Sequence, residues 1–140
     1  MVLPRLRQVV IDTKDPRSSA EFWRQLLGLV YRNGHEPPPQ GSPDSAGRDW
    51  LNLQTEDGHP VLAFQYVEEL PESTWPEAIT PQQLHLDLSV STFIELQESF
   101  GLAISLGGRL LFDRREDDVE PLVVIADTAG HPFCIFVSTN

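Results

Sequence analysis

The order of polar and apolar residues in 6–13 predicts a β-strand. The segment is short and rich in β-branched side chains, as strands commonly are. Since successive side chains of a strand point to opposite faces, Val9 and Ile11 share one face, while Gln8 and Asp12 share the other. We expect the apolar face to pack against a helix and the polar face to border a wet cavity.

A helix is predicted directly after this strand. Asp15 is a favourable N-cap, and Pro16 suits the first position of a helix. Apolar side chains recur at helical spacing over 22–27, and Gly28 is a typical helix end. Further strands are expected at 29–32, 48–54 and 61–67. Residues 34–47 between them form a polar loop, of a length that often covers a binding site.

The same order of elements returns after an acidic, proline-containing stretch at 68–81. Residues 83–90 predict a strand with leucines on one face and His85 and Asp87 on the other. A helix with a capping box at 92–95 follows. Its expected apolar stripe is Phe93, Leu96, Phe100 and Ile104, and the remaining strands are expected at 109–112, 122–126 and 133–138.

Two matching stretches support the interpretation of a duplicated unit. Gly58-His59-Pro60 recurs 72 residues later as Gly130-His131-Pro132, and Gln8 aligns with His85 at an offset of 77 residues. The difference between the offsets falls in a helix and a loop, where duplicated folds tolerate changes of length. We therefore predict an α+β protein with a single domain over 1–140, built from a module over about 5–67, a connector over about 68–81 and a module over about 82–139.

The charge balance narrows the classes of partner. The chain has 10 Lys and Arg against 21 Asp and Glu, a net charge of −11. Because such a chain repels nucleic-acid phosphates and anionic membranes, we expect neither as a partner. The single cysteine, Cys134, excludes an internal disulfide. The absence of an apolar run of about 18 residues and of a secretory signal favours a cytoplasmic protein.

Four segments carry a resemblance to a known family: 8–15 (Gln-Val-Val-Ile-Asp-Thr-Lys-Asp), 22–29, 85–88 (His-Leu-Asp-Leu) and 127–134 (Asp-Thr-Ala-Gly-His-Pro-Phe-Cys). The chain resembles the glyoxalase/bleomycin-resistance/extradiol-dioxygenase family, also called the vicinal oxygen chelate superfamily. The resemblance implies two βαβββ modules with paired curved mixed sheets around a central cavity, and assembly as a homodimer. Since the family includes isomerases, dioxygenases, epimerases, metal-dependent transferases and non-catalytic drug-binding proteins, the fold alone does not define the function.

The resemblance also implies where a metal ion would bind. In catalytic members of the family, four residues hold one divalent ion, one near the start and one near the end of each module. Carried over to this chain, the positions are Gln8, Leu62, His85 and Cys134. Leu62 follows from the 72-residue offset and cannot bind a metal, and neither can its neighbour Ala63. We therefore do not favour a metal site, although a divalent ion held by Gln8, His85 and Cys134 stays possible, and the cofactor is otherwise unknown.

The predicted ligand pocket combines these positions with acidic and aromatic neighbours. It comprises Gln8, Asp12, Trp50, Leu62, Phe64, His85, Asp87 and Cys134. The catalytic residues are unknown, with His85 the best candidate. The simpler alternative for His85 is a hydrogen-bonded residue that only lines the cavity. For Cys134 the alternative is a small buried apolar residue.

The leading functional hypothesis is a protein that holds a small organic ligand between its two sheets, for sequestration or for metal-independent chemistry. One alternative is a metal-dependent lyase, isomerase or dioxygenase of the same superfamily. A further alternative is a non-catalytic interaction domain without a ligand. A ligand screen and an elemental analysis of the purified protein discriminate between these classes.

Overall fold

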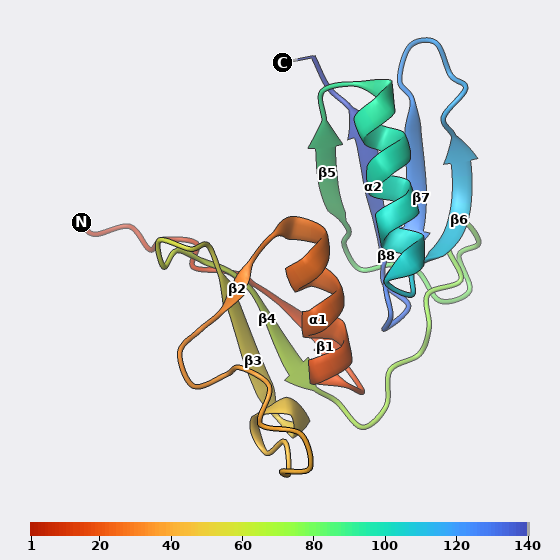
Figure 1. The fold of residues 1–140 in the computed structure, drawn as a ribbon. Coiled ribbons are helices and arrows are strands. Elements are labelled where there is room, and N and C mark those ends of the chain that lie inside the picture. Colours follow the sequence, from red (N-terminus) through yellow and green to blue (C-terminus); the bar gives the residue numbers. More distant parts are fainter. Residues whose placement is uncertain (140) are drawn as a thin grey trace. The chain divides into compact units, whose positions relative to one another are not determined.

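The computed structural model describes residues 1–139 and divides into two compact units, with the boundary between Leu70 and Pro71. We call these units the first and the second module. Each has a four-stranded sheet with one helix lying on one of its faces (Figure 1). The opposite face of each sheet is called the helix-free face below. Residues 71–81, expected as part of the connector, belong to the second module.

The first module follows the predicted order of elements. It contains β1 (Val9–Thr13), α1 (Pro16–Leu27), β2 (Val30–Tyr31), the short 3-10 helix η1 (Ala46–Arg48), β3 (Trp50–Gln54) and β4 (Pro60–Tyr66). The strands lie in the order β1-β4-β3-β2, with β1 parallel to β4. α1 begins where the Asp15 carboxylate accepts a hydrogen bond from the Ser18 backbone N–H. It ends at Gly28, whose φ of 66° favours glycine.

The second module repeats this topology. It contains β5 (Leu86–Val90), α2 (Phe93–Ser105), β6 (Arg109–Arg114), β7 (Leu122–Ala126) and β8 (Pro132–Val137). The strands lie in the order β5-β8-β7-β6, and β5 is parallel to β8, as β1 is to β4. The predicted α+β fold of two βαβββ modules is thus confirmed. Neither helix in residues 1–139 is long and apolar enough to cross a membrane.

The core of the first module lies between α1 and its sheet. Phe22 and Trp23 of α1 are buried, and their rings meet edge to face with centroids 5.4 Å apart. On the sheet, Ile11, Phe64 and Leu51 are neighbours across three strands and share the helix-covered face. Because aromatic side chains bury the largest apolar areas, the buried rings of Phe22 and Trp23 contribute strongly to the packing of α1 on its sheet.

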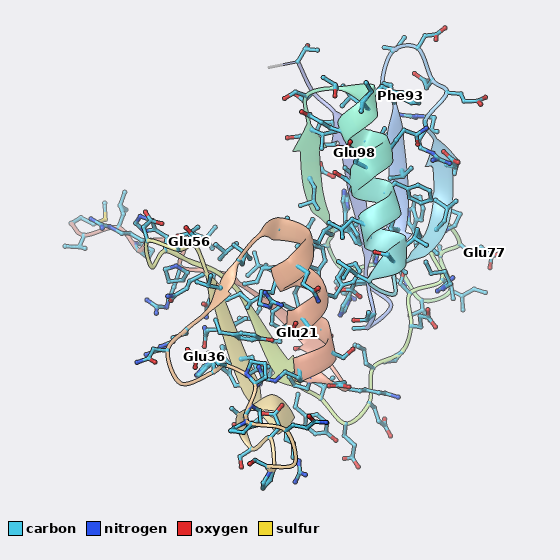
Figure 2. The ribbon with its side chains drawn as sticks, in the orientation of Figure 1. Glu21, Glu36, Glu56, Glu77, Phe93 and Glu98 are labelled. Atoms are coloured by element: carbon cyan, nitrogen blue, oxygen red, sulfur yellow. The ribbon has the colours of Figure 1, made fainter. Side chains whose placement is uncertain are left out.

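The helix of the second module turns a different side toward its sheet from the apolar stripe that was predicted. Leu96 and Ala103 are buried, whereas Phe93 and Ile104, two members of the expected stripe, are exposed. The buried residues Leu96 and Ala103 lie about two helical turns apart, so they define the side of α2 that faces its sheet. The turn after the helix is tight, because the Gly108 N–H donates to the backbone oxygen of Ala103 at 2.8 Å. Figure 2 shows Phe93 in the first turn of α2.

The loop at 34–47 is attached to α1. The Arg17 guanidinium donates two hydrogen bonds to the Asp44 carboxylate, at 2.7 and 2.9 Å, and a third to the backbone oxygen of His35 at 2.7 Å. The same group lies over the Tyr31 ring, 4.9 Å from its centroid. The predicted polar loop therefore has a defined anchor on the helix.

Candidate functional site

Three of the predicted site residues lie together on the helix-free face of the second module. Asp87 of β5 is the register partner of Cys134 of β8. His85 lies just before β5, with its Nε2 3.2 Å from Oδ1 of Asp87. The side chains of His85 and Asp87 are 45% and 58% exposed, so both can contact a ligand. An imidazole next to a carboxylate can exchange a proton while the carboxylate orients the ring.

Cys134 is not poised for nucleophilic chemistry. Burial, followed by the negative charges of Asp87 and Glu120, raises the pKa of the Cys134 thiol to about 11, and the charge of Arg114 acts against them. The reactive form of cysteine is the thiolate. At neutral pH Cys134 therefore serves as a weakly polar surface beside the His85–Asp87 pair.

Apolar residues continue this face toward the edge of the sheet. Val124 of β7 is the register partner of Cys134, and Phe112 of β6 is the partner of Val124. The ring of Phe112 meets that of Trp75 edge to face, with centroids 6.3 Å apart. Val124, Phe112 and Trp75 were not among the residues predicted to line the pocket. Val124 and Phe112 could have been predicted from strand pairing, because partners across antiparallel strands share a face.

The helix-free face of the first module carries a chain of hydrogen bonds. Asn52 of β3 donates from Nδ2 to Oε1 of Gln8 at 2.9 Å, and its Oδ1 accepts the indole N–H of Trp50 at 2.6 Å. Asn52 is only 6% exposed. Gln8 and Trp50 were predicted site residues, whereas Asn52, which links them, was not. In the sequence, Asn52 could be recognised as a site residue only from its position two residues after Trp50, which places both on the same face of the strand.

A β-bulge distinguishes β4 from β8. Pro60 and Pro132 occupy equivalent places at the starts of these strands, as the 72-residue offset predicts. Beyond Pro60 the register between β3 and β4 shifts and passes over Val61, whereas β8 continues from Pro132 without a shift. The extra residue reduces the offset to 71 and reverses the face on which each following side chain lies.

The bulge corrects the prediction for two pocket residues. Leu62 and Phe64 are buried on the helix-covered face, paired with apolar residues of β1. They belong to the core beneath α1 and do not line the helix-free face. Ala63 is the residue that corresponds to Cys134. Asp12, in contrast, is exposed on the helix-free side of β1, as predicted from its alternation.

A separate cavity of about 580 Å³ lies beside α2. Its lining includes Phe93 and Gln97 of the helix and Asp113 and Arg115 at the end of β6. The Arg115 guanidinium donates to both carboxylate oxygens of Asp113 and to Gln97. Asp113, Arg115 and Gln97 satisfy one another, whereas Nε of Arg114, which also lines the cavity, is buried and has no hydrogen-bond partner among the described residues.

Comparison with known proteins identifies the family. Residues 8–136 match the model of the glyoxalase-like domain, so the chain belongs to this family, within the vicinal oxygen chelate superfamily. The search of curated proteins gives no match.

Solved structures share the fold at low sequence identity. A glyoxalase/bleomycin resistance protein/dioxygenase family enzyme from Burkholderia phytofirmans PsJN has a TM-score of 0.65 and 16% identity, covering 94% of this chain and 96% of its own. A glyoxalase-related enzyme from Fulvimarina pelagi has a TM-score of 0.65 and 18% identity, covering 97% and 89%. A variant of the fosfomycin resistance protein FosX from Listeria monocytogenes, complexed with Mn(II) and 1S,2S-dihydroxypropylphosphonic acid, has a TM-score of 0.66 and 14% identity, covering 99% and 93%.

The residues at the family's metal positions do not fit a four-ligand ion site. With the bulge taken into account, these positions hold Gln8, Ala63, His85 and Cys134. Ala63 has no donor atom, so at most three of the four positions can supply a ligand. The amide oxygen of Gln8 already accepts a hydrogen bond from Asn52. Within residues 1–139, no three His, Cys, Asp or Glu side chains form a cluster that could hold a metal ion.

Proposed function

We propose that the protein binds a small organic ligand on the helix-free faces of its sheets, without a complete metal site. The observation that supports this proposal most is the row on the second module, which leads from Asp87 through Cys134 and Val124 to Phe112. Small-molecule sites combine such an apolar surface with a few polar groups that orient the ligand. The relative bound to a phosphonic acid shows that this fold can hold a small organic molecule.

The role of each part follows from its chemistry. The aromatic pair of Phe112 and Trp75 offers a surface for the apolar body of a ligand. His85 can donate or accept a hydrogen bond, and Asp87 accepts one. In the first module, Gln8 and Trp50 supply a surface whose polar atoms bond within the chain. The ligand, in this proposal, is either sequestered or transformed by proton transfer at His85, without a metal.

A thermal-shift screen tests the proposal. We expect at least one compound from a panel of small organic acids, amines and planar aromatic molecules to raise the melting temperature by about 5–10 °C at a concentration near 100 Kd. His85→Ala should reduce that shift. The matched control is His59→Ala, since His59 is an exposed histidine in a turn of the first module. Equal shifts in both variants, or no shift in any, would contradict the proposed site.

Elemental analysis addresses the rival function, a metal-dependent lyase, isomerase or dioxygenase. We expect the untagged protein to contain Mn, Fe, Ni, Co and Zn far below one equivalent per chain. A near-stoichiometric metal that is lost in His85→Ala would overturn the proposal and support the rival. A failed ligand screen together with a metal-free protein would favour a non-catalytic interaction domain.

The proposal also includes an oligomeric state and a cellular location for the protein. The resemblance to the family leads us to propose a homodimer, which sedimentation of the purified chain would test by its mass. We also propose that the protein is cytoplasmic, and the charge of −11 supports the absence of nucleic-acid and anionic-membrane partners. Retention on a nucleic-acid or anionic-lipid column at physiological salt would contradict that part.

A further inference from the structure

His35 completes the edge of β3 with its side chain. β2 has only two residues, Val30 and Tyr31, and the chain leaves the sheet after them. The backbone oxygen of Asn52 accepts a hydrogen bond from the Arg32 N–H at 3.0 Å. The backbone N–H of Asn52 has no strand partner on this side and donates instead to Nδ1 of His35, at 2.9 Å. An imidazole therefore takes the place of a strand carbonyl.

This edge contact leads directly to the helix-free face. The side chain of Asn52 bonds to Gln8, which lies just before β1, at one end and to the indole of Trp50 at the other. Gln8 and Trp50 are predicted ligand-site residues. Since Asn52 is almost completely buried, a change in its backbone position moves both hydrogen bonds.

The backbone of His35 is held from the other side by α1. Arg17 donates to the His35 backbone oxygen at 2.7 Å and is itself bonded to Asp44. His35 thus bridges the anchored loop and the strand that carries Asn52. The loop contributes to the candidate site through this one side chain.

The contact with Asn52 requires a neutral imidazole. Nδ1 accepts a hydrogen bond only while it carries a lone pair, and in the protonated ring both nitrogens are donors. Burial lowers the pKa of His35 below its ordinary value of 6.5, with the positive charges of Arg32 and Arg17 acting in the same direction and the negative charge of Glu36 against it. Glu36 lies on the loop (Figure 2) and accepts the Gly34 N–H. The neutral form therefore prevails at pH 7.

We propose that His35 is a positioning residue for the candidate ligand face: its neutral imidazole holds Asn52 in place, and through Asn52 it fixes Gln8 and Trp50, whereas its protonation releases them. This inference rests on the proposed function, because it gives Gln8, Asn52 and Trp50 a common role in ligand binding.

The indole N–H of Trp50 reports on this role without any ligand. The chain has three tryptophans, and Trp50→Phe identifies the Trp50 signal in ¹H–¹⁵N spectra by its loss. We expect that signal to shift upfield, as its hydrogen bond to Asn52 weakens, when the pH is lowered from about 8 to about 5, with a midpoint below 6.5. A Trp50 signal that does not move over this range would overturn the proposal.

Two substitutions separate positioning from general stability. In His35→Asn, the amide oxygen can take the place of Nδ1 as acceptor but does not titrate, so the Trp50 signal should stay in its neutral-pH position throughout. In His35→Ala it should resemble the acid form at every pH. His59→Asn, at an exposed histidine of the same module, should leave the titration unchanged. A titration that persists in His35→Asn, or disappears in His59→Asn, would contradict the assignment to His35.

These experiments distinguish a failure of the His35 proposal from a failure of the proposed ligand binding. If the Trp50 signal titrates through His35 but no compound of the panel binds, the positioning role holds and the ligand-binding proposal fails. If a compound binds with the same Kd at about pH 7.5 and about pH 5.5, and equally in His35→Ala and the wild type, the protein binds a ligand and the role of His35 is refuted. Far-UV circular dichroism checks that each variant is folded.

Discussion

The two modules have the same strand order and different helix-free faces. In the first module the polar side chains bond to one another, from Gln8 through Asn52 to Trp50. In the second module, His85 and Asp87 form an exposed pair next to apolar residues. The same fold therefore carries two different surfaces: the polar side chains of one face are bonded within the chain, and the His85–Asp87 pair of the other is exposed.

The two helices also differ in how they pack on their sheets. α1 buries two large aromatic rings and is joined to the loop at 34–47 through Arg17. α2 meets its sheet with Leu96 and the small Ala103, and it leaves Ile94 exposed. Glu21 on α1 and Glu98 on α2 mark the two helices in Figure 2. The comparison indicates that bulky aromatic side chains fix the first helix on its sheet, whereas smaller side chains hold the second.

The strongest test of this difference is removal of an aromatic anchor. Trp23 is 1% exposed, so Trp23→Ala should lower the free energy of unfolding by about 3–5 kcal/mol, through lost transfer energy and a residual cavity. Ile94→Ala on α2 is the matched control, because Ile94 is 70% exposed and should change stability by less than about 0.5 kcal/mol. Urea unfolding followed by circular dichroism measures both. Similar losses would mean that α2 is buried in solution by a partner.

The anchored loop provides the next test. Arg17 and Arg115 each donate two hydrogen bonds to a carboxylate, and their side chains are 16% and 23% exposed. The carboxylate bonded to Arg17 lies 27 positions away, whereas the one bonded to Arg115 lies two positions away and Arg115 also donates to Gln97, 18 positions away. We expect Arg17→Met to lower the free energy of unfolding by about 2 kcal/mol and Arg115→Met by less than about 1 kcal/mol.

The Arg17 contact also has a pH signature. The guanidinium holds the pKa of Asp44 below its ordinary value of 3.8. Its stabilising effect is therefore complete above pH 3.8 and is lost as the pH falls through the lower folded-state value. Unfolding curves at several acidic pH values should show a smaller loss for Arg17→Met than for the wild type. An identical loss would place the acid sensitivity elsewhere.

The helix caps should produce a smaller effect. Thr92 accepts the Glu95 N–H, and Glu95 accepts the Thr92 N–H in return. Asp15 caps α1 alone, by accepting the Ser18 N–H. We expect Thr92→Ala and Asp15→Ala each to lower the free energy of unfolding by about 1 kcal/mol. Thr92→Ser should retain most of that stability, and a full loss in Thr92→Ser would show that the hydroxyl is not the stabilising group.

The smallest expected effect concerns Cys134. With a pKa of about 11, its thiol should react slowly with iodoacetamide at about pH 8, and the rate should rise as the pH approaches 11. Asp87→Asn removes a negative charge that favours the protonated thiol, so the rate at about pH 8 should increase roughly two- to threefold. Glu120→Gln should act in the same direction. Fast alkylation of the wild type at neutral pH would contradict the burial of the thiol.

The local patterns of the sequence were sufficient for the fold and for part of the site. Alternation at 6–13 and 83–90 placed Asp12, His85 and Asp87 on the correct side of their strands, because strand side chains alternate whatever the surroundings. The caps at Asp15 and Thr92 were visible for the same reason, since a cap depends on residues a few positions apart.

Two other features depend on contacts between distant residues. The register shift at Val61 placed Ala63 in the position assigned to Leu62, and strand pairing rather than composition determines where such a bulge occurs. The bonds from Asn52 to Gln8 and His35 join residues 44 and 17 positions apart. Hydrogen bonds of this kind form only after the strands have paired and the loop has been anchored, so no local pattern indicates them.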